Sequence, residues 1–244
     1  MFYNLSMMKK LSYLLLLLLL AGCAPESDFE KYKEHVKTLA SDEFEGRKPG
    51  TQGGEKTKNY IADHFESLGL SSFGGSYLMP VNLTGINLNV DESYFNLSVN
   101  GEMMNVNYRS DVVYGTTRQI EEVSFVDCDL VFVGYGVNAP EYEWNDYKVD
   151  VKDKTVVMLI NDPGFELKGT EFNGKAMTYY GRWTYKFEEA ARQGAAGVLI
   201  IHETAPACYP WGVVENGWSG EQLNLTFADQ NLDRSALEGW IHLI

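Results

Sequence analysis

Hydrophobic residues recur at two different periods along the chain, and the change of period predicts where helices give way to strands. Between Glu26 and Ala40, apolar residues return every three or four positions, which is the spacing of one helix face. A second helical repeat opens at Thr51 or the glycines beside it and stops at Gly69, a common helix terminator. The apolar faces of this predicted helix pair are Phe29, Tyr32, Val36 and Leu39, and then Tyr60, Ile61, Phe65 and Leu68.

The stretch EGRKPGTQGGEKTKNY (Glu45 to Tyr60) has the glycine, lysine and threonine content of a phosphate-binding loop. A P-loop reads G-x-x-x-x-G-K-[ST], and counting from Gly50 places Glu55 where the second glycine belongs. A carboxylate at that position would repel the anion that the backbone N–H groups should hold. The segment before it is also polar with helical spacing, not a buried strand. We therefore interpret the stretch as a rigid connection between two helices.

Beyond Ser76 the period changes to two. Apolar residues from Val81 to Val90 alternate with polar ones around Gly85. Two further short runs flank Asn100-Gly101, a dipeptide typical of two-residue hairpin turns. The pattern predicts antiparallel sheet in this region.

The last third of the chain alternates between short buried strands and a helix. DLVFVGYG (129–136), TVVMLIN (155–161) and GVLIIH (197–202) are continuous apolar runs typical of strands covered on both faces. A helical pattern spans Arg182 to Gln193, and Gly194 ends it. This order of elements predicts an α/β unit.

The N-terminus has the pattern of an export signal. Lys9 and Lys10 precede a leucine run, Leu14 to Leu20, that is short for a membrane span. The following LAGC, Leu20 to Cys23, resembles a bacterial lipobox, in which the cysteine is lipidated. We expect an exported cell-envelope lipoprotein anchored through Cys23; an ordinary secretory signal that contains a cysteine is the alternative.

The net charge limits which binding partners are expected, and the cysteine content limits which disulfides can form. The net charge is −14, and removing residues 1–22 would make the chain more acidic, which disfavours nucleic acid and anionic lipid as partners. Membrane attachment is then expected through the lipid alone, and Ala24 after the acylated cysteine favours the outer membrane. Cys128 and Cys208 remain, and a disulfide and two free thiols are both open.

No residue pattern in the chain indicates a complete catalytic centre. NGWSGE (216–221) lacks one residue of a nucleophile elbow and is interpreted as a turn. The four histidines stand in no metal-ligand spacing and are expected at the surface or at helix ends. Carboxylates such as Asp150, Asp153, Asp162 and the Glu188-Glu189 pair are interpreted as a solvated acidic surface. The histidines are His35, His64, His202 and His242.

The segment YYGRWTY (179–185) concentrates aromatic residues around Arg182. A guanidinium group among tyrosines suits recognition of a carboxylate or a peptide, because it is a donor fork and a stacking plane. Packing at a helix entrance would explain the same residues. We keep Tyr180 and Arg182 as candidates for the rim of a substrate cleft.

Three stretches carry a resemblance to a known family. LASDEFEGRKPGTQGGEKTKNYIADHFESLGL (39–70) resembles the opening of secreted zinc-dependent aminopeptidases of the aminopeptidase Y and glutamate carboxypeptidase type. LVFVGYGVNAPEYEWNDYKVDVKDKTVVMLINDPG (130–164) and YYGRWTYKFEEAARQGAAGVLIIHETAPACYPW (179–211) resemble the protease-associated (PA) domain inserted in many of them.

The resemblance implies a division of the chain and a fold class. Residues 1–22 would be the lipoprotein signal and 23–80 the N-terminal helical segment of an α/β peptidase domain. Residues 81–128 would form an antiparallel β connection, and 129–244 a PA domain of mixed β-sheet with flanking helices. The expected class is thus α/β or α+β.

In the family, two zinc ions are held by residues that follow the PA domain, so the resemblance implies no metal or catalytic residue within this chain. We expect an N-terminal portion of a lipid-anchored metallopeptidase that acts on peptides, with this portion shaping substrate access and not itself catalytic. The alternative is a stand-alone anchored module that binds peptides or a partner protein.

Overall fold

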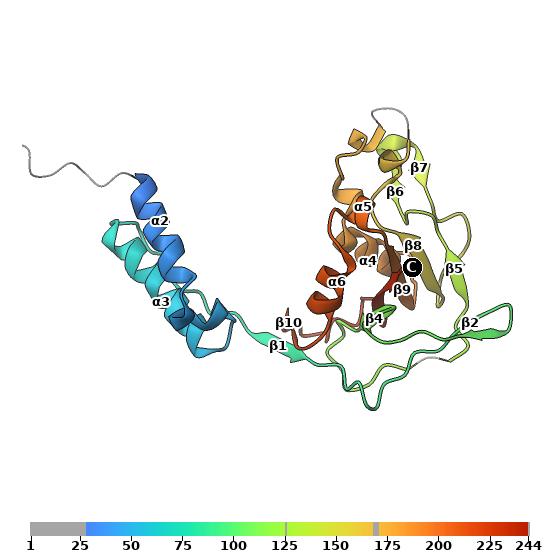
Figure 1. The fold of residues 1–244 in the computed structure, drawn as a ribbon, viewed down its shortest axis with the longest axis horizontal. Coiled ribbons are helices and arrows are strands. Elements are labelled where there is room, and N and C mark those ends of the chain that lie inside the picture. Colours follow the sequence, from blue (N-terminus) through green and yellow to red (C-terminus); the bar gives the residue numbers. More distant parts are fainter. Residues whose placement is uncertain (1–27, 125, 168–170, 244) are drawn as a thin grey trace, which may run out of the picture. The chain divides into compact units, whose positions relative to one another are not determined.

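The computed structural model describes residues 28–124, 126–167 and 171–243, and the chain divides after Pro80 into two compact units (Figure 1). The predicted signal segment and Cys23 lie outside the described residues, so export and lipidation stay predictions. Within the described ranges, no helix combines the length and apolar character needed to cross a bilayer.

The first unit contains the predicted pair of helices. The side chain of Thr51 accepts a hydrogen bond of 3.2 Å from the backbone N–H of Gly54, which satisfies a donor in the first turn of the second helix. Gly69 follows that helix with φ of +67°, a left-handed conformation that glycine adopts freely. The elements are α2 (Asp28–Leu39), the 3-10 helix η1 (Asp42–Arg47) and α3 (Gln52–Ser67).

Two glycines explain the glycine-rich stretch between the helices. A Cβ atom on Gly53 would lie 2.2 Å from the carbonyl oxygen of Phe44, and one on Gly54 would lie 2.3 Å from that of Lys48. Only residues without a side chain let the backbone of η1 approach the first turn of α3 so closely. The interpretation of this stretch as a structural connection is confirmed.

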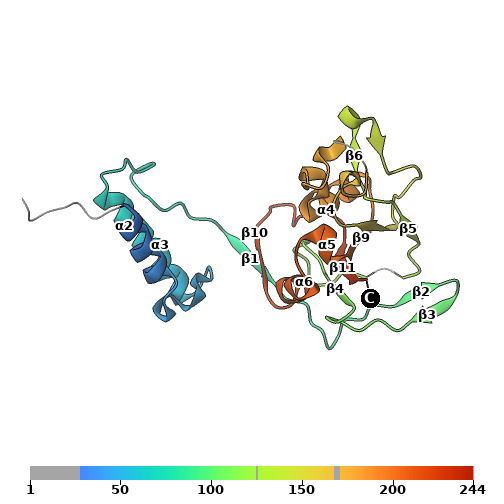
Figure 2. The same ribbon diagram turned by 45° about the horizontal axis from the view of Figure 1, so that its top comes forward.

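The second unit is built on a mixed five-stranded sheet of the general α/β class (Figures 1 and 2). Its order is β4-β11-β9-β8-β5, in which β5, β8, β9 and β11 run parallel and β4 pairs antiparallel with β11. The three apolar runs predicted as strands are confirmed as β5, β8 and β9, but the expected burial on both faces is wrong for β5, an edge strand in which Leu130 and Phe132 are exposed. The strands are β4 (Val112–Gly115), β5 (Leu130–Phe132), β8 (Thr155–Leu159), β9 (Gly197–His202) and β11 (Leu237–His242).

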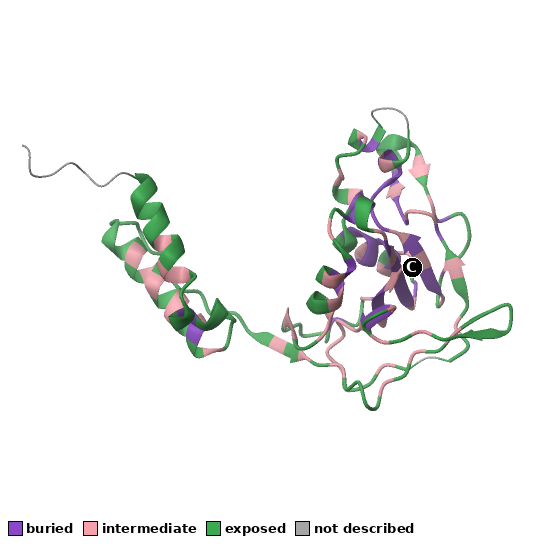
Figure 3. Cartoon of the chain, viewed as in Figure 1, coloured by how far each residue is buried: buried purple, intermediate pink, exposed green. Residues whose placement is uncertain are grey.

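One face of this sheet packs against helices and forms the main core. Alternate residues of β8 and its extension, Val156, Met158 and Ile160, share a buried cluster with Phe187 of α4 and Trp211 of α6. Buried positions accordingly concentrate in the strands and in the helices that cover them (Figure 3). The helices are α4 (Trp183–Arg192), which was predicted, α5 (Thr204–Ala207) and α6 (Trp211–Trp218).

Smaller elements complete the second unit. Asn100 and Gly101 both have positive φ, at +54° and +84°, and confirm the predicted hairpin with its primed turn. The remaining strands are β1 (Leu83–Ile86) with its partner β10 (Gln222–Leu225), the hairpin β2 (Leu97–Val99) and β3 (Glu102–Met104), and β6 (Asn138–Ala139) with β7 (Trp144–Asn145). The 3-10 helices are η2 (Pro140–Tyr142), η3 (Pro163–Phe165), η4 (Glu171–Asn173) and η5 (Tyr179–Gly181).

Two local predictions hold only in part. The antiparallel strand predicted from Val81 to Val90 is confirmed over the four residues of β1, which pair with β10, and the structure assigns no strand to the rest of that run. The segment NGWSGE is not a single turn: Asn216 to Trp218 close α6, and the chain turns afterwards at Gly220, which has φ of +90°.

Candidate functional site

The described part of the second unit contains an open groove of about 320 Å³ beside α4. Such a volume is at the lower end of the range for small-molecule sites. One side is α4, another is β10 with the residues after it, and the floor includes the start of β11. The residues that line the groove include Trp183, Phe187, Leu223, Phe227, Arg234 and Glu238.

Side-chain to backbone hydrogen bonds fasten one wall of the groove. The amide of Gln119 donates from Nε2 to the carbonyl oxygen of Leu225 at 2.5 Å and accepts through Oε1 from the N–H of Phe227 at 3.0 Å. The amide Nδ2 of Asn231 donates to the carbonyl oxygen of Thr117 at 3.0 Å. These bonds tie the segment after β4 to the segment after β10, so the wall is held in place without a ligand.

The floor of the groove contains a buried carboxyl group. Glu238 is 4% exposed, and the hydroxyl of Thr117 donates to its Oε1 at a long 3.4 Å. Burial raises the pKa of Glu238 to about 7; the nearby Arg234 and the Thr117 hydrogen bond act in the opposite direction, and Glu188 adds to the increase. In the described residues, no cationic side chain forms an ion pair with this carboxyl.

The guanidinium group of Arg234, which lines the groove, interacts with a carboxylate on α4. The guanidinium Nη1 of Arg234 lies 3.8 Å from Oε1 of Glu188. Glu188 also accepts a hydrogen bond of 3.0 Å from the hydroxyl of Tyr179 and lies 3.9 Å from Nη1 of Arg192. Arg234, the one cationic residue among the described residues that line the groove, therefore already has a carboxylate partner.

The order of the parallel strands gives no indication of a ligand site at their carboxyl ends. Ligands of open α/β sheets bind where the strand order reverses. Here β5, β8, β9 and β11 follow one another across the sheet in sequence order, so these strands contain no such reversal. The groove beside α4 is the stronger candidate site.

The two residues predicted for a substrate rim lie at the start of α4. Tyr180 belongs to η5, donates its hydroxyl to Oε1 of Glu141, and packs edge to face on Tyr185 at 4.9 Å between ring centroids. That hydrogen bond, with burial, raises the pKa of Tyr180 to about 12. Arg182 is exposed and precedes the first residue of α4. Tyr180 thus packs at the helix entrance, while the rim role of both residues stays a prediction.

Two of the carboxylates interpreted as solvated surface are buried, so that interpretation is wrong for them. Asp162 is fully buried and accepts hydrogen bonds from the N–H of Gly164 at 3.1 Å and from the N–H and hydroxyl of Thr178 at 2.9 and 2.6 Å. Glu189 is buried and accepts from Nδ2 of Asn138 and Nε of Arg192. Both carboxylates organise loops around the sheet and are not placed as an acid/base pair.

The histidines do not gather around a common point. His35 and His64 lie in the first unit, with ring centroids 4.3 Å apart. His202 is buried, contrary to expectation; its Nε2 lies 3.1 Å from the carbonyl oxygen of Tyr209, and its Nδ1 has no partner. Across the described residues, no three His, Cys, Asp or Glu side chains are placed to hold a metal. The described chain thus supplies no ligand set for the two zinc ions that the resemblance implies.

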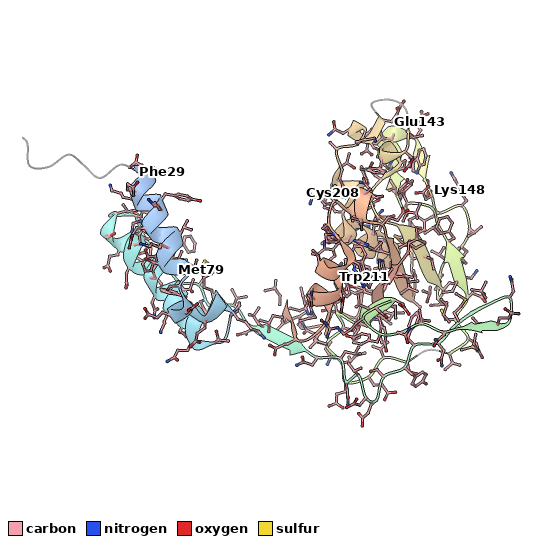
Figure 4. The ribbon with its side chains drawn as sticks, in the orientation of Figure 1. Phe29, Met79, Glu143, Lys148, Cys208 and Trp211 are labelled. Atoms are coloured by element: carbon pink, nitrogen blue, oxygen red, sulfur yellow. The ribbon has the colours of Figure 1, made fainter. Side chains whose placement is uncertain are left out.

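Cys128 and Cys208, the two cysteines in the described residues, are both free thiols in the structure. Cys128 is partly exposed, and Cys208 is exposed at the end of α5 (Figure 4). The sequence left open whether Cys128 and Cys208 form a disulfide, and in the structure they do not.

No protein-family model, curated protein or solved structure matches the chain. Its function is therefore argued from its residues and their geometry.

Proposed function

We propose that this chain is the N-terminal and PA-like portion of an exported, lipid-anchored, zinc-dependent aminopeptidase. In this proposal it shapes the access of peptide substrates, and a peptidase domain supplied by the parent protein performs the hydrolysis. The zinc ions of that domain would activate a water molecule and polarise the scissile carbonyl. No residue of this chain is assigned a part in that step.

The observation that carries the proposal is the unpartnered apolar face of the first unit. Among residues 28–80, Phe44 is the one apolar side chain that is buried. Ile61 and Phe65 on α3 and Leu68 at its C-cap are 39%, 40% and 60% exposed. On α2, Phe29, Tyr32 and Val36 are exposed as well. Burying side chains of this kind contributes about 1.5 to 3 kcal/mol each.

A helix pair that hides so little apolar surface needs a further surface to pack against. The resemblance suggests that surface, because residues 39–70 resemble the opening of the peptidase domain, whose helices lie on a central sheet. We therefore assign the exposed face of α3 to contact with the peptidase sheet. The alternative occupant, the chain's own second unit, is an outcome of the test below.

In the second unit, the stretches that resemble the PA domain, 130–164 and 179–211, cover β5 through β8 and α4 through β9. A sheet with covering helices gives the peptidase a rigid body beside its cleft, with the exposed guanidinium of Arg182 and the ring of Tyr180 at the rim. This rim would contact peptide substrates through hydrogen bonds and stacking.

The test compares the chain alone with the protein expressed from its complete gene. With zinc added, the complete protein should hydrolyse aminoacyl reporter substrates in a chelator-sensitive manner, and the chain alone should not. Ile61→Glu should lower the yield of folded complete protein and leave the fold of the second unit unchanged in the chain alone. Asn59→Glu, an exposed change on the same helix, is the control.

A complete gene without a His-x-Asp ligand motif would refute the proposal. Chelator-sensitive turnover by the chain alone would refute the non-catalytic role. If Ile61→Glu destabilises the second unit of the chain alone, the face of α3 packs on that unit and the assigned docking is wrong.

A further inference from the structure

The groove beside α4 holds a carboxylate that the protein leaves without a cation. Glu238 is the second residue of β11, and its backbone is fixed by pairing with Gly115 on one side and Val198 on the other. The side chain is therefore positioned by the central sheet and not by a mobile loop. Its one hydrogen-bond donor among the described residues is the hydroxyl of Thr117, at 3.4 Å.

A buried carboxylate without a cationic partner is costly, because the charged form loses its hydration and regains little of it from the protein. Arg234 lines the same groove, but its guanidinium is directed to Glu188 at 3.8 Å. A cation brought by a ligand would therefore supply the missing partner of Glu238.

The walls suit the remainder of such a ligand. Trp183 and Phe187 line one side, with ring centroids 6.1 Å apart and planes inclined by 67°, and Phe227 belongs to the other. Aromatic faces attract a cation placed above them and also cover apolar groups. Leu223 adds an aliphatic contact. At about 320 Å³ the groove has room for a small molecule or a short piece of a peptide and not for a folded partner.

We propose that this groove binds a primary ammonium group on an apolar body, with the ammonium at Glu238 and the body against Trp183, Phe187 and Leu223. The ammonium of a peptide N-terminus and that of a lysine side chain share this chemistry. The net charge of −14 favours the approach of cationic ligands to the chain. The proposal goes beyond the peptidase assignment and does not depend on it.

Binding is measured on the full chain by isothermal titration calorimetry with three probes. Leucyl-leucinamide carries an α-ammonium, N-acetyl-leucyl-leucinamide carries none, and Nα-acetyl-lysine amide carries only the side-chain ammonium. At least one of the two ammonium probes should bind, and the acetylated dipeptide should bind weaker by about tenfold or more, the value of a charge-assisted contact. Leucyl-leucinamide alone would identify a peptide N-terminus, and the lysine probe alone a lysine side chain.

Two variants assign the site. Glu238→Gln keeps the side-chain shape and should weaken ammonium binding by about tenfold or more. Glu102→Gln, on the exposed strand β3, removes the same charge from the hairpin and should leave binding unchanged. Trp183→Ala, at a partly exposed wall position, gives an independent readout with a smaller loss, about threefold.

Equal binding of the free and acetylated dipeptides, or no binding of either ammonium probe, would overturn the proposal. So would unchanged affinity in folded Glu238→Gln or, if that variant does not fold, in Trp183→Ala. Because the measurement needs neither zinc nor turnover, its outcome is separate from that of the peptidase test.

Discussion

The ammonium nitrogen of Lys186 lies 2.5 Å from the backbone carbonyl oxygen of Tyr135, and the lysine side chain is fully buried. This bond ties the middle of α4 to the segment that follows β5. Burial lowers the pKa of Lys186 to about 7, although Asp146 and Asp162 favour its charged form. The helix that forms one wall of the groove is thus held at its centre by a titrating group.

The lysine predicts a pH dependence of stability. Its pKa is lower in the folded chain than the ordinary value of 10.5, so the unfolded chain binds more protons between about pH 7 and 10. The free energy of unfolding should therefore rise with pH in this window, by about 1.4 kcal/mol per pH unit at most. Urea unfolding at pH 7, 8 and 9 measures the slope.

Lys186→Met should abolish that slope, and Lys148→Met is its matched control. Lys148 is exposed and lies on the outer side of the second unit (Figure 4). An equal slope in wild type and Lys186→Met would show that the buried ammonium does not titrate as described.

For Glu238 we expect a pH dependence of stability of the opposite sign, in a lower pH range. Its pKa of about 7 in the folded chain lies above the ordinary 4.5, so the folded chain binds more protons between these values. Stability should fall as the pH rises from about 4.5 to 7, by about 2 to 3 kcal/mol in total. Arg234, Glu188 and Thr117 are the groups that face this carboxyl and modulate the loss.

The difference in unfolding free energy between wild type and Glu238→Gln isolates this effect from other titrating groups. As the pH rises from 5 to 7, the unfolding free energy of Glu238→Gln should increase relative to that of wild type. The unfolding free energy of Glu102→Gln should follow that of wild type over the same range. A difference that is constant with pH would contradict the assignment. The measurement is urea unfolding followed by tryptophan fluorescence.

Removing the carboxylate of Asp162 should cause a large loss of stability. Its carboxylate accepts three hydrogen bonds, from the N–H of Gly164 and from the N–H and hydroxyl of Thr178, in a fully buried position. Asp162→Ala leaves these donors without an acceptor and should cost about 3 kcal/mol. Asp150→Ala, in an exposed loop, should change the free energy by less than about 1 kcal/mol. Comparable effects of both changes would mean that the buried contacts contribute little.

The two units should differ in amide hydrogen exchange. Local opening is easiest where few apolar contacts are buried, which describes α2 and α3, and hardest in the central strands β8, β9 and β11. In the chain alone, amides of α3 should exchange much faster than those of β9. Protection of α3 equal to that of the central strands would contradict this and would also weaken the proposed need for an external sheet.

The sequence by itself determined the local elements. The cap at Thr51, the glycine after α3, the Asn100-Gly101 hairpin and the apolar runs of β8 and β9 depend on neighbouring residues along the chain, so their patterns could be recognised without a structure. The alternation of strand and helix also indicated the α/β class.

Tertiary structure alone decided the burial of charged groups and the pairing of distant segments. Asp162 and Lys186 occupy polar or amphipathic positions in the sequence, and only the surrounding sheet and loops remove them from water. The groove joins Thr117, α4, β10 and Glu238, which are separated by up to 121 positions along the chain. Periodicity reports which face of an element is apolar, but not which distant element covers it, so a site assembled from four separate segments emerges only when the chain is folded.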